Sequence, residues 1–216
     1  MKTYSFILAL LLVFSCGKNN TSGHPKGAPG LNNYTGPLTS ETKILSVQDT
    51  MNGIMVQGTT ANFAIPLPGR GDYNYRFKDQ LVVVTYQDHG PRVKIYNAVG
   101  RQLVNGSMVM QNARVTLDGT AFAIEYYENT RERMIAMNSA GQVLVNNLVA
   151  DKIRADVDYG VVAVTYRNGT SERVLVVRDN GQLLVSDNRA YITPRVSIEP
   201  YDVIIRHASG VERIPH

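Results

Sequence analysis

The chain has 216 residues, and its 22 Lys and Arg against 18 Asp and Glu give a formal net charge of +4. Charges of both signs are interspersed, so the sequence lacks the clustered basic patch that nucleic-acid binding requires, and no nucleic-acid partner is expected. A single cysteine, Cys16, excludes an internal disulfide and a multi-cysteine zinc site.

The first residues of the chain have the sequence features of an export signal. A short basic start that includes Lys2 precedes an apolar run from Tyr4 to Phe14. Because a membrane-spanning helix needs about 20 apolar residues, this run is too short to span a bilayer and fits a signal peptide. The run ends in Val13-Phe14-Ser15-Cys16, which resembles the lipobox of bacterial lipoproteins. The resemblance implies a signal peptide over residues 1–15 and a diacylglycerol group on the Cys16 thiol.

Residues 17–37 are rich in Gly, Asn, Pro, Ser and Thr and contain few apolar side chains. Such a segment cannot bury enough surface to offset the entropy of ordering, so we expect a lipidated, flexible tether over residues 16–37. The lipoprotein resemblance implies that acyl chains on Cys16 anchor the protein to a membrane of the cell envelope. Because Gly17 rather than Asp follows the cysteine, the expected location is the outer membrane, facing the periplasm or the exterior.

The remaining residues, 38–216, repeat with a period close to 40. Tyrosines, glycines and arginines recur at intervals of 40 or 41 residues. The recurring residues are Tyr86, Tyr126, Tyr166, Gly100, Gly141, Gly181, Arg92, Arg133, Arg173 and Arg213. A fixed period of this length is the signature of a repeat architecture.

Each repeat contains four short segments with the composition of β-strands. In the clearest copy the predicted strands cover residues 153–157, 161–166, 173–177 and 182–185. Asn-Gly pairs at 168–169 and 180–181 supply the positive φ that tight hairpin turns need. Apolar residues after Phe14 show no helical periodicity.

Four antiparallel strands every 40 residues resemble one blade of a β-propeller, so the sequence predicts an all-β, propeller-like array. Full copies are expected at 73–110, 111–150 and 151–190, a partial copy over 191–216, and a worn copy within 44–67, which makes about 4.5 to 5 units. If the units close into a ring, a strand within 38–50 is expected to complete the last one, because an uncovered edge invites aggregation. A β-sandwich is the alternative fold, and the absence of Trp leaves the propeller subfamily unidentified.

Two sets of repeated residues have structural interpretations. Each repeated tyrosine ends a second strand and each repeated arginine begins a third, so Tyr126 and Arg133 are expected to form a cation–π clasp of about 0.5–1 kcal/mol. Asp118, Asp158 and Glu199 fall between the first and second strands, where an acidic side chain caps a turn.

Three arginines are the candidate binding residues of the domain. Arg114, Arg154 and Arg195 each stand four residues before one of the turn acids, with Arg76 and Asp79 as a looser first copy. In a propeller the first strand of each blade lines the axis. We therefore hypothesise that the three arginines ring a central opening and bind an anion or a partner's carboxylate.

The sequence contains no motif for catalysis, a metal or a cofactor. No nucleophile elbow, zinc-protease motif or phosphate-binding loop occurs, and the histidines are scattered. Glu125 and Glu128 flank two tyrosines at a strand end, as surface carboxylates commonly do. The prediction is a lipid-anchored, non-catalytic binding or scaffold module for a protein or glycan partner. An envelope hydrolase acting on glycan or peptide and a purely structural envelope protein remain the alternatives.

Overall fold

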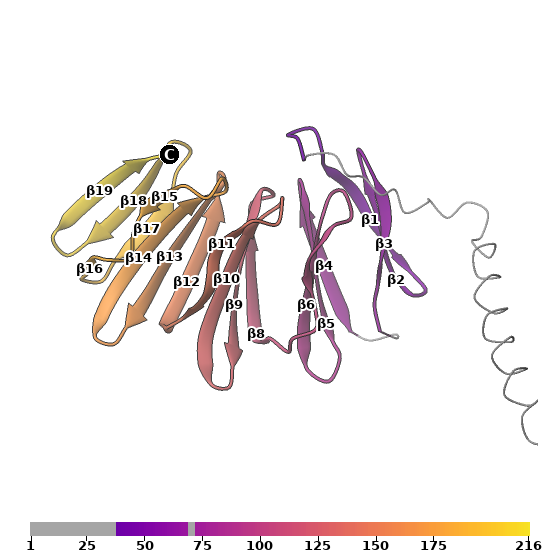
Figure 1. Ribbon diagram of the computed structural model, residues 1–216, viewed down its shortest axis with the longest axis horizontal. Coiled ribbons are helices and arrows are strands. Elements are labelled where there is room, and N and C mark those ends of the chain that lie inside the picture. The colour runs from indigo at the N-terminus through magenta and orange to yellow at the C-terminus, as the bar shows by residue number, and fades with distance from the viewer. Residues whose placement is uncertain (1–37, 69–71) are drawn as a thin grey trace, which may run out of the picture. The chain divides into compact units, whose positions relative to one another are not determined.

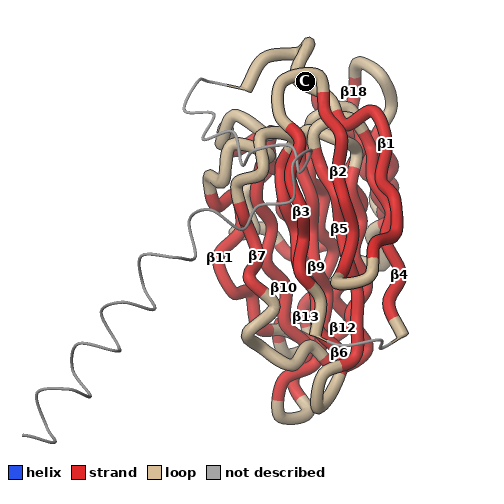
Figure 2. The backbone as a smooth tube through the Cα atoms, turned by 90° about the vertical axis from the view of Figure 1, so that its right-hand side faces the viewer, coloured by secondary structure: helices blue, strands red, loops and turns tan. Residues whose placement is uncertain are grey.

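The computed structural model describes residues 38–68 and 72–216, and these form strands and turns with no helix (Figure 2). It follows that no helix within those ranges is long and apolar enough to cross a membrane. The strands form five antiparallel sheets that succeed one another along the chain (Figure 1). We number them sheets 1 to 5 in chain order.

Each sheet is built from strands that are consecutive in the sequence. Sheet 1 contains β1 (Ile44–Thr50), β2 (Gly53–Gly58) and β3 (Asn62–Pro66). Sheet 2 contains β4 (Tyr73–Lys78), β5 (Leu81–Gln87), β6 (Pro91–Asn97) and β7 (Gln102–Asn105). Sheet 3 contains β8 (Gln111–Leu117), β9 (Ala121–Glu128), β10 (Arg131–Asn138) and β11 (Val143–Val149).

Sheets 4 and 5 complete the array. Sheet 4 contains β12 (Asp151–Asp158), β13 (Val161–Asn168), β14 (Ser171–Arg178), β15 (Leu183–Val185) and the short β16 (Ala190–Tyr191), which pairs with β14. Sheet 5 contains β17 (Arg195–Ile198), β18 (Asp202–His207) and β19 (Gly210–Pro215). In every sheet the first strand lies at one edge.

The predicted all-β, propeller-like array is therefore confirmed, including the worn copy that forms sheet 1. The β-sandwich alternative is wrong, because the strands divide into five sheets rather than two. The strand expected within 38–50 does not complete the last sheet. It is β1, and it pairs with β2 in its own sheet.

Apolar side chains fill the space between each pair of consecutive sheets. Four separate clusters of buried residues join sheets 1 and 2, 2 and 3, 3 and 4, and 4 and 5. The second strands contribute to both sides, as in β13, where Val162 and Val164 face sheet 3 while Val161 and Ala163 face sheet 5. Burial on both faces explains why these strands read as continuous apolar runs rather than alternating ones.

The repeated glycines form the turn between the third and fourth strands of sheets 2, 3 and 4. Gly100, Gly141 and Gly181 have φ values of 82°, 85° and 86°, a region that glycine enters without steric cost. The N–H of Gly141 donates to the Asn138 carbonyl at 2.9 Å, and the same bond recurs in the other two sheets. The conformational demand of this turn accounts for the glycine period in the sequence.

The repeated tyrosines and arginines lie directly opposite each other across the second hairpin, as predicted. The cation–π interpretation is wrong: among the described residues such contacts join other pairs, Lys94 with Tyr86 and Arg189 with Tyr191. Instead, Arg92 and Tyr86 both donate to the Gly106 carbonyl, at 3.0 and 3.2 Å.

The same clasp recurs in sheets 3 and 4. Arg133 Nη1 donates to Asn147 Oδ1 at 2.9 Å, and Arg173 Nη1 donates to the Asp187 carbonyl. Tyr166 also donates its hydroxyl to Asp187, at 2.5 Å. The repeated arginine therefore holds the fourth strand, or the loop after it, against the second hairpin in all three sheets, and the tyrosine adds a hydrogen bond in sheets 2 and 4.

Removing one clasp arginine tests this role. Arg92→Met keeps the apolar stem but removes donors from the Asp88, Gly106 and Ser107 carbonyls. We expect a loss of about 1–3 kcal/mol in the free energy of unfolding, measured by urea denaturation. Arg131→Met, at an exposed arginine that begins β10, is the control and should change stability by less than about 0.5 kcal/mol. Equal losses in both variants would contradict the clasp.

Candidate functional site

The candidate site is a pocket of about 280 Å³ between sheets 3 and 4. It is polar and carries both signs of charge. Its lining residues are Asn112, Arg114, Glu125, Tyr126, Tyr127, Glu132, Arg133, Ile153 and Arg154. The antiparallel register of β8 and β9 places Arg114 directly opposite Glu125, and β12 brings Arg154 to the other side of the pocket.

Glu125 is the buried carboxylate of this pocket, with 8% of its surface exposed. One oxygen accepts the N–H of Ala155 at 2.8 Å, and the other lies 3.9 Å from Nη1 of Arg154. Burial raises the pKa of Glu125, while the Ala155 N–H and the positive charges of Arg114 and Arg154 act in the opposite direction. The effect of burial is the larger one, so the Glu125 carboxyl is protonated more readily in the pocket than it would be in water.

Glu132 of β10 provides a second carboxylate that faces the same edge of β12 as Glu125 does. Its Oε2 accepts the N–H of Ile153 at 2.7 Å, and its Oε1 accepts the hydroxyl of Tyr127. The hydrogen bond to Glu132 is the main reason that the pKa of Tyr127 is raised. Since β12 is the edge strand of sheet 4, the two glutamates of sheet 3 satisfy backbone donors that would otherwise be unpaired.

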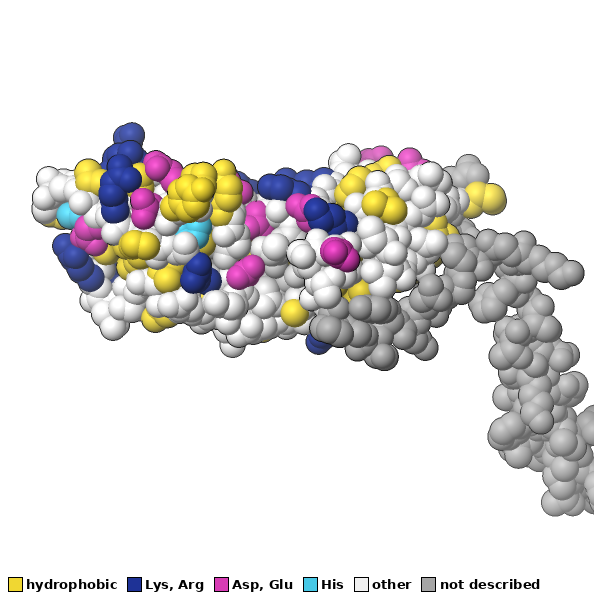
Figure 3. Space-filling model, turned by 90° about the horizontal axis from the view of Figure 1, so that it is seen from above, with side chains coloured by type: hydrophobic (Ala, Val, Ile, Leu, Met, Phe, Trp, Pro, Cys, Tyr) yellow, Lys and Arg dark blue, Asp and Glu magenta, His cyan; other side chains and the backbone are white. Residues whose placement is uncertain are grey.

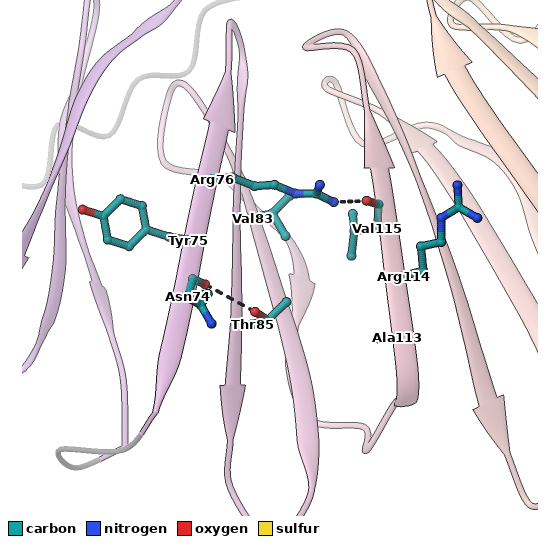
Figure 4. Close-up of a pocket in the computed structure, with 8 residues that line it drawn as sticks. All are labelled: Asn74, Tyr75, Arg76, Val83, Thr85, Ala113, Arg114 and Val115. Carbon is teal, nitrogen blue, oxygen red and sulfur yellow. Dashed lines mark hydrogen bonds between the residues drawn. The ribbon is translucent and has the colours of Figure 1, made fainter.

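A related contact joins sheets 2 and 3. Arg76 extends from β4 toward β8, where its Nη2 donates to the Val115 carbonyl, and burial lowers the pKa of its guanidinium (Figure 4). Tyr75 points the opposite way and donates its hydroxyl to the Val47 carbonyl of sheet 1 at 3.4 Å. The pocket beside Arg76 measures about 340 Å³ and has Arg114 on its far side.

The three predicted arginines occupy equivalent positions but do not share a pocket. Arg114 and Arg154 line the pocket between sheets 3 and 4, whereas Arg195 begins β17, one sheet further on. Their cross-strand partners are Glu125, Thr165 and Arg206. The corresponding pair in sheet 2 is Asn74 and Thr85, so Arg76 is not the first copy of this position. That the three arginines ring a central opening stays a prediction.

The turn acids behave unequally. Asp118 caps its turn as predicted, because its Oδ1 accepts the N–H groups of Thr120 and Ala121 at 2.8 and 2.9 Å. Its Oδ2 also accepts the N–H of Gly160 in sheet 4 at 2.5 Å. Asp158 accepts only the neighbouring N–H of Tyr159, and the Glu199 side chain makes no hydrogen bond to any described residue.

Two glutamates near the predicted arginines make contacts that the sequence did not predict. Glu132 belongs to no known motif, but it recurs as Glu172 and Glu212 at the repeat period, and this recurrence could have marked it as structurally important. Glu128, paired with Glu125 in the sequence, instead forms an ion pair with Arg133 at 2.7 Å. Within the described ranges, no group of three or more His, Cys, Asp or Glu side chains has the arrangement of a metal site.

Cys16 lies outside the described residues, as do the expected signal peptide at 1–15 and the tether at 16–37. Lipidation and the division of the chain into these segments therefore stay predictions.

No protein-family model and no curated protein matches this chain. Among solved structures it is similar to TolB from Acinetobacter baumannii, with 13% identity, a TM-score of 0.35, and coverage of 81% of this chain and 52% of that one. A eukaryotic initiation factor has 9% identity and a TM-score of 0.41, over 81% of this chain and 56% of the other. A TolB from Agrobacterium tumefaciens, described as putative in its own name, has 12% identity and a TM-score of 0.34, over 79% and 76%.

The chain spans about half the length of the first of these proteins. At such TM-scores the likeness supports no statement about function.

Replacing the buried carboxylate tests the electrostatics of the pocket. Because the folded-state pKa of Glu125 is raised, the native state binds this proton more tightly than the unfolded chain does. Its contribution to stability is therefore greatest below the unfolded pKa of about 4.3 and is lost as the pH rises through the folded value. Glu125→Gln keeps an acceptor for Ala155 and should raise the melting temperature at neutral pH and flatten this loss.

Thermal unfolding across the pH range measures the effect, with Glu199→Gln at an exposed turn as the matched control. A melting temperature that falls at neutral pH in Glu125→Gln would show that the charged carboxylate stabilises the pocket, contrary to this prediction.

Proposed function

We propose that the protein is a non-catalytic binding or scaffold module of the bacterial cell envelope. In this proposal a lipid on Cys16 holds it at the outer membrane, and the pocket between sheets 3 and 4 binds an anionic group of a protein or glycan partner. The observation that carries the proposal is the pair of exposed arginines, Arg114 and Arg154, at the two sides of one polar pocket.

The charges of the pocket support a binding role. Three arginines line it, against the two carboxylates of Glu125 and Glu132. Both carboxylates already accept backbone N–H groups of β12, and Arg133 is engaged in its clasp. Arg114 has no hydrogen bond or ion pair with any described residue, so its guanidinium is available to a ligand. A planar guanidinium binds a carboxylate or phosphate in two-point fashion, which suits recognition of an anion.

The location rests on the sequence alone. The Val13-Phe14-Ser15-Cys16 segment resembles a lipobox, and the apolar run before it is too short to span a membrane. Two or more acyl chains make a stable anchor, since each buried CH₂ contributes about 0.8 kcal/mol. The tether expected after Cys16 would separate the sheets from the membrane surface.

A hydrolase acting on envelope glycans is the second candidate, because two carboxylates share this pocket. The N–H groups they bind are two residues apart on β12, a spacing of about 7 Å. Against this reading, both carboxylates are occupied by backbone donors of the fold itself.

One set of variants tests the anchor and the pocket separately. The full-length protein, a Cys16→Ser form and an Arg114→Ala/Arg154→Ala form are produced in a Gram-negative host. Membrane fractionation should release only the Cys16→Ser form. Binding to an array of anionic envelope glycans should fall by about tenfold or more only in the double arginine variant, a loss of about 1.4 kcal/mol.

Arg101→Ala/Arg131→Ala removes the same charge at exposed positions outside the pocket and is the control. Membrane association of the Cys16→Ser form would refute the anchor. Unchanged array binding in the pocket variant would refute the binding role, and cleavage of an arrayed glycan that Glu125→Gln abolishes would favour the hydrolase.

A further inference from the structure

The two faces of sheet 5 differ in chemistry. Alternate residues of its strands pack toward sheet 4, among them Val196, Val203 and Ile205. The register places the intervening residues on the opposite face. That face carries Arg195, Ser197, Asp202, Ile204, Arg206, Val211, Arg213 and Pro215. We call it the arginine face.

The positive charge of this face is only partly compensated. Arg213 lies 3.5 Å from Asp202, which is the one acid among the strand residues of this face; Glu199, just beyond β17, donates its backbone N–H to the Asp202 carbonyl at 2.9 Å. Arg206 donates to the Ser197 hydroxyl at 3.3 Å, and Arg195 has no hydrogen bond or ion pair with any described residue. Figure 3 shows Lys and Arg side chains, with Asp and Glu side chains near them, at the end of the molecule formed by sheet 5. Of the three exposed arginines, only Arg213 therefore has an acidic partner among the described residues.

Arg195 and Arg206 stand directly opposite each other on β17 and β18. Like charges in this arrangement destabilise a sheet, because their Cβ atoms are only about 4.5–5.5 Å apart. Neither side chain relieves the repulsion by bonding an acid among the described residues. An anionic group between the two guanidiniums would convert this repulsion into a pair of charge-assisted hydrogen bonds.

The arginines also lie over an apolar floor. Ile204, at the centre of the face, is 1% exposed although it points away from sheet 4. Arg213 is its direct neighbour on β19, and Arg206 lies two residues along β18. Arginine stems cover apolar surface while their charged ends remain in water, so the guanidiniums of this face point toward solvent.

The opposite end of the array lacks this character. The face of sheet 1 that points away from sheet 2 carries Ser46, Gln48, Met55, Gln57 and Ala64, with Ser46 donating to Gln57 at 2.9 Å. This face carries no charged side chain at these positions. It also offers no acids to a second copy stacked end to end, so a copy of this chain does not complement the arginine face.

We propose that the arginine face docks an acidic, extended segment of a partner protein. One carboxylate of the segment binds between Arg195 and Arg206, and a second one binds near Arg213. The strand spacing of about 4.8 Å across the sheet sets these cations at intervals that neighbouring side chains of a peptide can match. The face is distinct from the pocket between sheets 3 and 4, so the inference does not depend on the function proposed for that pocket.

Binding of a labelled ten-residue peptide of Glu and Gly to the purified full-length protein tests the proposal by fluorescence anisotropy. Arg195→Gln/Arg206→Gln should weaken binding about tenfold or more and reduce its salt dependence. Arg101→Gln/Arg131→Gln removes equal charge elsewhere and should change affinity by about twofold or less. Arg114→Ala/Arg154→Ala should bind the peptide as the wild type does.

Folding is checked independently. Because the paired arginines repel each other, Arg206→Gln should leave the unfolding midpoint unchanged or higher, and Arg195→Lys/Arg206→Lys should keep most of the affinity. Equal weakening by both glutamine variants, or no binding by the wild type, would overturn the proposal. Vesicles of phosphatidylglycerol that bind through Arg195 and Arg206 more tightly than the peptide would overturn it in favour of a lipid surface.

Discussion

Apolar packing between consecutive sheets is the interaction on which the rest of this structure depends. A single sheet of three or four strands cannot bury its faces alone, and here each sheet does so against its neighbours in the sequence. The second strands, β5, β9 and β13, lie at the centre of this arrangement, since their first four residues are buried on both faces. Stability in such an array is approximately a sum of contributions from each unit and from each interface.

Stacking of this kind leaves the first strand of every sheet with an unpaired edge, and the polar site follows from that constraint. Sheet 3 covers the edge of β12 with Glu125 and Glu132, while sheet 2 reaches β8 with Arg76. Side chains long enough to satisfy the neighbouring backbone leave polar pockets between the sheets. The pocket and the structural contacts therefore use the same residues. Arg114 makes none of these contacts with a neighbouring backbone among the described residues. Arg195 is the equivalent residue of sheet 5, whose outer face meets no other described sheet.

Sequence reasoning succeeded where a local conformation repeats. The strands of sheet 4 follow from their Val-rich composition, and Gly141 follows from the positive φ of its turn. It was less successful where the outcome depends on register between strands. Arg76 was aligned with Arg114, but Asn74 holds that position, and Arg133 contacts Asn147 rather than the ring of Tyr126. The role of Glu132 depends on which backbone donors of the next sheet remain free, and only the packed structure shows this.

Native-state hydrogen exchange tests the packing claim most directly. Amides of β5, β9 and β13 should exchange most slowly, because opening them requires two apolar layers to separate. Met134 is fully buried in the layer between sheets 3 and 4, so Met134→Ala should accelerate exchange in β9 and β13 while leaving β2 of sheet 1 unchanged. Equal acceleration in β2 would contradict an array in which each sheet is stabilised mainly by its immediate neighbours.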